Sequence, residues 1–405
     1  MRVFPAFLLL PTLLFGSSLA AQDKKPDAPQ APAVDESKVD AAIKKGIAYL
    51  RTAPSPSAHA GIKDSDELIL WTYAHSGIGE DDPDFQKYWK KMLEGPLEKT
   101  YKVALQAMIL EELDRVKFQE RIAQCAQFLV DNQCLNGQWS YGNPSEFVKD
   151  VKVPEPTRST ATPAKSGAKD FSAPGERVKP KIVQHVPVKK MKDGPAAGDN
   201  SNTQYAALGL RACFDAGIMI PEPTIVLAVK WWREAQFADA PKLDKDGKPV
   251  VASGGTGKAE GWNYKDQATQ ADKPPYLAMT AGGTSALVIY DYMLDRRWKE
   301  DAHVKSGMNW LVQHFAVNTG YYYMYGLERT GILFGTEKFG THDWYAEGAA
   351  VLLKAQNADG SWGKAAAAKP DDKGKLTHDT CFAILFLRRA TRPLVATEGG
   401  GKLKK

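Results

Sequence analysis

The stretch QCLNGQW (133–139) decides how this sequence is interpreted, because its pattern returns as QNADGSW (356–362). Both copies read Q-x-x-x-G-x-W. A third, stretched copy begins at Gln236 and resumes at Gly261 and Trp262 after a Gly/Lys insertion. Glycine permits the turn that ends a helix, and glutamine can bond the free backbone groups found there. We therefore predict the same helix-ending turn, covered by a tryptophan, at three places.

Two kinds of helical segment alternate along the sequence, before and after these turns. One kind is amphipathic, as in 117–132, and buries a single stripe. The other kind is apolar nearly all round, as in 278–294, and must be covered on every side. The amphipathic segments begin near residues 37, 84, 117, 222, 300 and 341. Each precedes an apolar one, near 64, 101, 201, 278, 320 and 377. The sequence thus predicts an all-α protein made of six repeated helix pairs.

The last apolar segment indicates how the pairs are arranged. An open solenoid would need polar caps at both ends, and TCFAILFL (380–387) is not a polar cap. A closed ring satisfies both kinds of helix, with the apolar helices inside and the amphipathic helices outside. The sequence therefore favours a ring over a solenoid.

The repeated turns and helix pairs resemble the repeats of squalene cyclases and of protein prenyltransferase β subunits. Those families share an (α/α)6 toroid of outer and inner helices joined by QW-type turns. The resemblance covers residues 37–390 without the insertion and is strongest in 199–390. There, NTQY (202–205) and DTCF (379–382) look like exported bacterial proteins of this repeat class. It implies a ring with a central cavity, but it does not imply a reaction.

The ends of the chain predict export. Arg2, an apolar run over 3–16 and small residues up to Ala20 are typical of a signal peptide over 1–20. A flexible leader over 21–36 follows. We expect a disordered insertion over 145–199 and a basic disordered tail over 391–405. No later segment is apolar for long enough to span a bilayer, so we expect a secreted or periplasmic protein without an integral membrane segment.

Charge and cysteine content narrow the function classes. The formal net charge is +5, and the basic excess lies in the segments expected to be disordered, which argues against a nucleic-acid partner. A helix would separate Cys125 from Cys134 by about 13 Å, too far for a disulfide unless the helix ends early. We therefore favour buried free thiols.

A cyclase would need a strong acid at the start of an inner helix. Asp-Ser-Asp-Glu (64–67) resembles the Asp-x-Asp-Asp motif of class II terpene cyclases, which would make Asp66 the proton donor. The motif departs from the family at Glu67 and lies in the first helix pair. The simpler interpretation is that these residues cap a helix and favour its dipole.

A prenyltransferase would need zinc. Asp379 and Cys381 have the spacing that the resemblance requires, but no histidine follows them, so His342 would have to complete the site. The simpler interpretation places Asp379 at a helix start and Cys381 in the core. We expect no cofactor, and zinc stays as an alternative.

A polysaccharide-cleaving toroid would use carboxylates or a Tyr/His/Arg set at the cavity. The stretch YYYMYGLER (321–329) offers Glu328 and Arg329 as catalytic candidates beside several tyrosines. Aromatic rings with a few polar groups suit a sugar or terpenoid ligand. These groups could equally pack and pair between helices. The residues expected to line or bind in the cavity are Trp71, Gln204, Tyr205, Tyr322, Tyr325, His342 and Asp343.

Two function classes therefore stay open. The first is an exported toroid that binds a small molecule or a protein partner without intact cyclase or prenyltransferase motifs. The second is an enzyme acting on an isoprenoid or a polysaccharide in the ring cavity.

Overall fold

The protein is all-α. The computed structural model describes residues 34–57, 64–153, 179–239, 257–266, 268–269, 273–318, 320–364 and 370–394. Within these ranges the odd-numbered helices are α1 (Glu36–Leu50), α3 (Pro83–Glu94), α5 (Gln119–Asp131), α7 (Glu222–Glu234), α9 (Ala302–Gln313) and α11 (Trp344–Ala355). The even-numbered helices are α2 (Asp66–His75), α4 (Thr100–Asp114), α6 (Asn200–Asp215), α8 (Leu277–Met293), α10 (Tyr321–Phe334) and α12 (Pro370–Leu387). Every segment predicted to be helical contains one of them.

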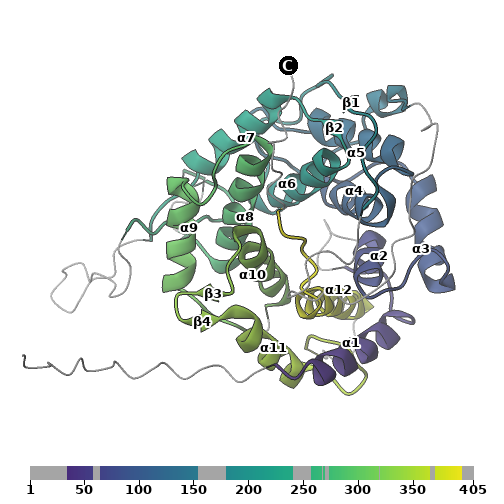
Figure 1. Ribbon diagram of the computed structural model, residues 1–405, viewed down its shortest axis with the longest axis vertical. Helices are drawn as coiled ribbons and strands as arrows, with labels where there is room; N and C mark the ends of the chain where they lie inside the picture. Colours follow the sequence, from purple (N-terminus) through teal and green to yellow (C-terminus); the bar gives the residue numbers. More distant parts are fainter. Residues whose placement is uncertain are drawn as a thin grey trace, which may run out of the picture.

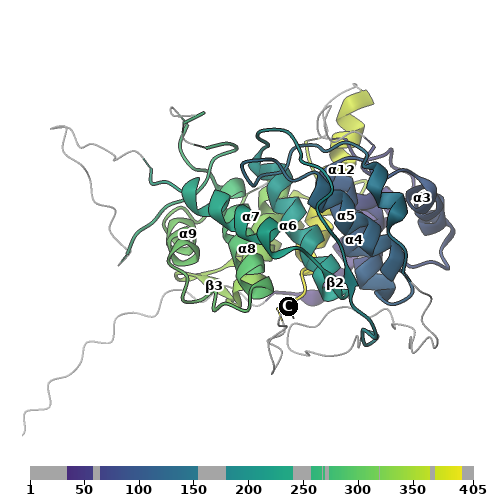
Figure 2. The same ribbon diagram turned by 90° about the horizontal axis from the view of Figure 1, so that it is seen from above.

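The even-numbered helices lie around a common centre, and the odd-numbered helices lie outside them (Figure 1). Each even-numbered helix contacts the next one along the chain, and α12 contacts α2. The first outer helix, α1, also contacts both α11 and α12. Figure 2 shows the same arrangement edge-on. The two ends of the helical region are therefore in contact with each other.

The buried residues of α2 and α3 match the two kinds of segment in the sequence, nearly all apolar and amphipathic. All ten residues of α2 are buried, whereas α3 buries only Phe85, Tyr88, Trp89 and Met92 along one stripe. Aspartates set several helix starts. For example, Asp82 caps α3 by accepting hydrogen bonds from two backbone amides, and Pro83 follows at the first helical position. The expected burial is therefore found for α2 and α3, whereas the outer helix α5 departs from it, because ten of its thirteen residues are buried.

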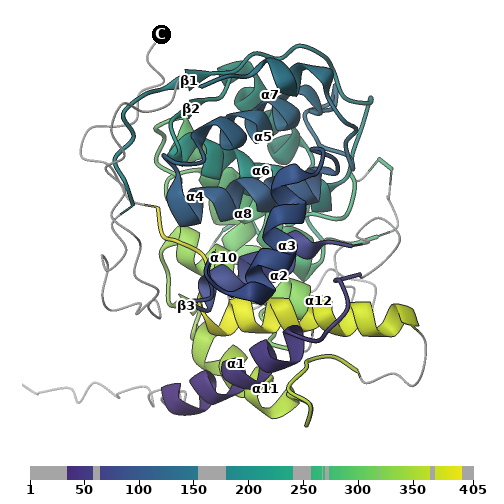
Figure 3. The same ribbon diagram turned by 90° about the vertical axis from the view of Figure 1, so that its right-hand side faces the viewer.

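Neighbouring inner helices run in the same direction, as the side view in Figure 3 illustrates for α4, α6 and α8. Tyr101 near the start of α4 contacts Tyr205 near the start of α6, with ring centroids 4.3 Å apart. Trp71 in the middle of α2 donates a hydrogen bond of 2.9 Å to Tyr325 in the first half of α10. The carboxyl ends of these helices therefore lie on one side of the molecule.

The three related turns make the same three kinds of hydrogen bond. Each indole N–H donates to a carbonyl four residues before the glutamine, at 2.7–2.8 Å. Each tryptophan backbone N–H donates to a threonine hydroxyl of the following inner helix, at 2.9–3.2 Å. Each glutamine amide donates to a carbonyl of the next outer helix. For Gln356 that carbonyl belongs to Ala42 of α1, at 2.8 Å.

One detail of the stretched turn differs from the expectation. Gly137 and Gly360 have φ of 95° and 90°, and their carbonyls accept a hydrogen bond from the glutamine of the same turn. In the third turn, Gln236 donates instead to the carbonyl of Glu260, at 3.2 Å. Glu260 thus takes the glycine position, and Gly261 takes the position between glycine and tryptophan. The prediction that Gly261 is the turn glycine is wrong.

Part of the expected disordered insertion has a defined conformation. Residues 146–150 form a 3-10 helix, η2 (Glu146–Asp150). Strand β1 (Val186–Pro187) pairs in parallel with β2 (Ile218–Met219). Buried glutamines of α5 hold this segment, since Gln119 donates to Gln184 and Gln127 donates to Lys189. The expectation of disorder is therefore wrong for 145–153 and 179–199, and residues 154–178 lie outside the described residues.

The predicted signal peptide, leader and C-terminal tail lie only partly within the described residues. The signal peptide and most of the leader fall on 1–33, outside the described residues, as do 395–405 of the tail. Residues 391–394, expected to be disordered, have a defined conformation and enter the centre of the molecule (Figure 1). A short antiparallel pair, β3 (Lys338–Phe339) and β4 (His342–Asp343), precedes α11. None of the described helices is long and apolar enough to cross a membrane.

Candidate functional site

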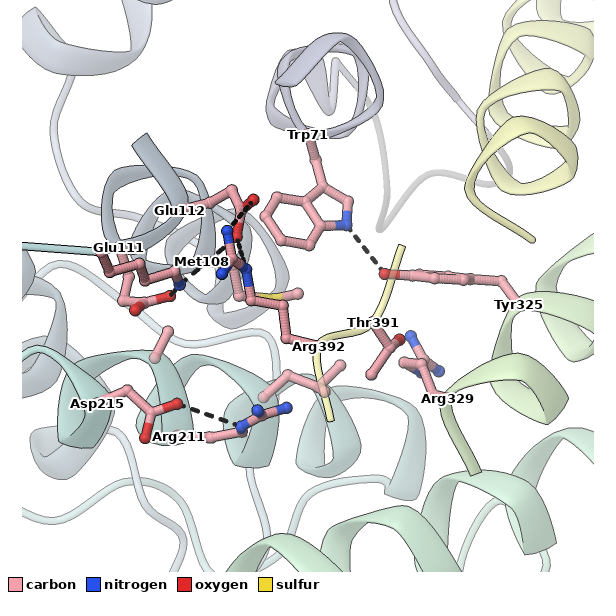
Figure 4. A pocket seen from close by; sticks show the side chains of 13 residues that line it. Trp71, Met108, Glu111, Glu112, Arg211, Asp215, Tyr325, Arg329, Thr391 and Arg392 are labelled. Atoms are coloured by element: carbon pink, nitrogen blue, oxygen red, sulfur yellow. Dashed lines mark hydrogen bonds and ion pairs between the residues drawn. The ribbon is translucent and has the colours of Figure 1, made fainter. Parts of the chain in front are cut away.

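The centre of the molecule receives the chain's own C-terminal segment. Helix α12 ends at Leu387, and Arg389 has a φ of 46°, a left-handed conformation that reverses the chain. The amides of Arg389 and Ala390 donate to carbonyls in the last turn of α12, which fixes this reversal. Thr391 and Arg392 then point between α4, α6 and α10 (Figure 4).

Three buried glutamates, which we call the acidic wall, meet this segment. They are Glu111 and Glu112 in the last turn of α4 and Glu328 in α10. Arg392 binds Glu112 through two hydrogen bonds of 2.6 and 2.8 Å. Thr391 donates to Glu328 from its backbone N–H at 2.9 Å and from its hydroxyl at 2.7 Å. A paired guanidinium and carboxylate of this geometry is among the stronger side-chain contacts.

The segment before α6 supplies a second cation to the same wall. Lys179 bonds Glu111 and lies 3.5 Å from Glu112. Arg211 of α6 pairs with Asp215 at 3.3 Å and donates to the carbonyl of Pro393 at 3.2 Å. Each wall carboxylate therefore has a donor from a segment that sequence analysis assigned to disorder.

The free space at this site is small. A cavity of about 50 Å³ lies between Glu111 and Glu112 of the acidic wall, Arg211, Tyr325 and the Thr391–Arg392 segment. A water molecule occupies about 30 Å³ in the liquid, and ligand pockets typically measure about 300–1,000 Å³. In this conformation the cavity has room for water but not for an isoprenoid or an oligosaccharide.

Aromatic side chains fill the rest of the centre. Tyr205 stacks with Tyr322 at 6.3 Å, and the guanidinium of Arg329 lies over the rings of Tyr205 and Tyr325, at 5.4 and 4.6 Å. Gln204 joins the two sides, since its amide donates to Tyr322 at 2.8 Å and its carbonyl oxygen accepts from Arg329 at 2.9 Å. We call the following six residues the central cluster: Trp71, Gln204, Tyr205, Tyr322, Tyr325 and Arg329. Six predicted site residues thus lie together, contributed by α2, α6 and α10.

The central cluster is poorly suited to proton abstraction. Burial raises the pKa of Tyr205, Tyr322 and Tyr325 above the ordinary value of a tyrosine. These phenols are therefore neutral at physiological pH, whereas a tyrosine base would need a lowered pKa. Glu328 faces the same centre, but both of its carboxylate oxygens already accept from Thr391.

The predicted proton donor lies elsewhere. Asp66 is the first residue of α2 and forms an ion pair of 2.6 Å with Lys91 of the outer helix α3. Its neighbour Glu67 is 6% exposed and lies 3.7 Å from Lys102. Burial raises the pKa of Glu67 to about 7. Neither acid lines the central cavity.

The remaining candidates are scattered. His342 is half-exposed, stacks on Phe315 at 4.4 Å and bonds Glu347 at 3.0 Å. Asp343 caps α11 by accepting from the amide of Ala346. Both belong to an outer helix start and not to the central cluster. The prediction that they line the cavity is therefore not supported by their contacts.

The residues proposed for zinc do not fit a zinc site. Asp379 pairs with Lys375 at 2.7 Å, and Cys381 is fully buried, which raises its pKa to about 12. A zinc-bound cysteine is a thiolate. No three His, Cys, Asp or Glu side chains are grouped as metal ligands in the described part of the chain. All four cysteines are buried and free, as expected.

The sequence singled out Glu328 of the acidic wall, but Glu111, Glu112 and the partners of all three glutamates were missed. A signal for the wall was present, because Glu111 and Glu112 are adjacent acids at the end of a helix that is otherwise apolar. The residues after α12 gave a weaker signal, since a short segment with three arginines, Arg388, Arg389 and Arg392, is typical of a solvated tail. No protein-family model matches the sequence, and no curated protein matches it.

Proposed function

We propose that this chain is an exported (α/α)6 toroid of the squalene cyclase and prenyltransferase repeat class that binds a ligand or partner without turning it over. The toroid is supported by the order of contacts among the even-numbered helices, which returns from α12 to α2. The repeat class is supported by the shared hydrogen bonds of the three turns, including the bond from Gln356 to Ala42.

The observation that carries the binding function is the state of the acidic wall. Glu112 and Glu328 each accept two hydrogen bonds from Thr391 and Arg392. Carboxylates held in this way act as acceptors for a bound segment and are poor proton-transfer groups, because both oxygens are engaged. The site has the chemistry of recognition and already holds a short peptide segment of its own chain.

An enzyme that protonates an isoprenoid is the second candidate, and Glu67 favours it. A carboxylic acid with a pKa of about 7 can hold a proton at neutral pH and donate it. One oxygen of Glu67 is buried without a hydrogen-bond partner among the described residues. Against this candidate, Glu67 does not line the central cavity.

Turnover measurements separate the two candidates. Purified protein is incubated with isoprenoid diphosphates and with oligosaccharides, and products are sought by mass spectrometry. We expect no product from the wild type. A product whose rate falls about 100-fold or more in Glu67→Gln or Glu328→Gln, with unfolding unchanged, would replace the binding function with an enzymatic one.

A further inference from the structure

We propose that the acidic wall is a binding site for an arginine-containing peptide, and that Thr391-Arg392 is its built-in occupant. This inference rests on the proposed binding function and names the class of its ligand. The chain's own segment shows which chemistry the site accepts: a guanidinium on Glu112, and a backbone N–H with a neighbouring hydroxyl on Glu328.

The guanidinium contact is specific in its geometry. The Nε and Nη2 atoms of Arg392 each bond a different oxygen of Glu112, at 2.6 and 2.8 Å. Only a planar, forked donor can make both bonds at once, so a lysine ammonium could not replace it. Glu112 is only 2% exposed. An unpaired carboxylate at this depth is costly, so the site requires a cation.

The helices around the site favour the same charge. Glu112 lies in the last turn of α4, and Arg211 and Asp215 lie in the last two turns of α6. The carboxyl end of a helix carries partial negative charge and stabilises a nearby cation. Lys179 binds Glu111 and lies 3.5 Å from Glu112, so the paired hydrogen bonds of Arg392 on Glu112 are made beside a second, more distant cation.

Outside the acidic wall, the occupant is held by one hydrogen bond to Pro393 and by the packing of Leu394 against the hydrophobic core. After the left-handed Arg389, residues 391–394 belong to no helix or strand. Pro393 adds one hydrogen bond, which its carbonyl accepts from Arg211. A segment held mainly by Glu112 and Glu328 can be exchanged for another that offers the same donors, and its departure would enlarge the present cavity.

The proposal is tested with the full-length Arg392→Ala variant and a blocked peptide of residues 390–394 (ATRPL). Binding is measured by calorimetry. In the wild type the tethered segment competes at an effective concentration on the order of millimolar. We therefore expect the peptide to bind Arg392→Ala about tenfold or more tightly than the wild type. The same peptide with lysine in place of arginine should bind the variant about tenfold more weakly.

Two further variants complete the design. Glu112→Gln in the Arg392→Ala background should lower peptide affinity about tenfold or more. Arg297→Ala is the matched control, because Arg297 forms an exposed ion pair with Glu300, and it should behave as the wild type. If Arg392→Ala does not fold, Arg392→Lys serves in its place, since it keeps a charge beside Glu112 but loses the fork.

The proposal is overturned if the arginine peptide does not bind, if the lysine peptide binds equally, or if Glu112→Gln has no effect. N-ethylguanidinium distinguishes a peptide from a free guanidino compound. Equal affinity for this ion and for the peptide would refute a peptide ligand. Mass spectrometry of the recovered peptide tests the underlying function separately, because a cleaved or modified peptide would contradict binding without turnover while leaving the site intact.

Discussion

Replacing Gly360 with alanine tests the turn that joins the last outer helix to the first. Gly360 has a φ of 90°, and a Cβ atom there would lie 2.4 Å from the carbonyl oxygen of Lys45 in α1. The left-handed conformation costs an alanine about 1–2 kcal/mol. Moving the turn away from α1 costs a further ~1–3 kcal/mol by analogy with overpacked cores. The stiffer unfolded chain returns about 0.4–1 kcal/mol. We expect Gly360→Ala to lose about 2–4 kcal/mol.

Urea unfolding followed by circular dichroism measures this loss. Gly137→Ala should lose a similar amount, because its Cβ would lie 2.4 Å from the carbonyl oxygen of Leu227 in α7. Gly79→Ala is the matched control, since nothing lies within 4 Å of its Cβ position. It should change stability by no more than about 0.5 kcal/mol. The reasoning fails if Gly360→Ala and Gly79→Ala unfold with the same free energy.

Three other predictions concern the interior. Because burial raises the pKa of Glu67 from 4.5 to about 7, the folded state holds this proton more tightly than the unfolded state, and the resulting stability is lost as pH rises through 7. Wild type should therefore lose up to ~3 kcal/mol relative to Glu67→Gln between pH 4.5 and 8 in urea unfolding, and parallel pH profiles would contradict this. The four buried cysteines should react with Ellman's reagent at pH 8 only after denaturation, since burial raises the pKa of Cys125 to about 12. Fast reaction of the native protein would contradict it. Trp71→Phe removes the donor to Tyr325 and should cost about 0.5–1.5 kcal/mol by thermal or urea unfolding. Unchanged stability would show that this bond contributes nothing.

The helices could be predicted because the distribution of apolar residues in each segment indicates which faces of its helix are buried. Inner helices such as α2 are apolar on all sides and outer helices such as α3 on one, so composition alone separates them. The central cluster could be predicted for the same reason. Tyr205, Tyr325 and Arg329 stand on helices with no exposed face, where a polar group must point to a partner inside.

The pairing of the acidic wall with its occupant could not be predicted, because it is non-local. Glu112 and Arg392 are separated by 280 positions, and nothing near either residue indicates the other. The segment after α12 is short and polar, so it is indistinguishable by composition from a solvated tail. The role of Glu260 was hidden similarly, since the inserted residues after Gln236 shift it away from the glycine of the other turns.

The charges at the centre also constrain how the site could open. Thr391 donates two hydrogen bonds to Glu328 and Arg392 donates two to Glu112, while Lys179 lies 3.5 Å from Glu112. A buried carboxylate that loses hydrogen-bond donors must gain other donors, take up a proton or become hydrated. A cavity of about 50 Å³ admits little water. Departure of the C-terminal segment would therefore remove four hydrogen bonds from these two carboxylates, and under the proposed binding function a peptide that replaces those bonds would compete with the segment for the site.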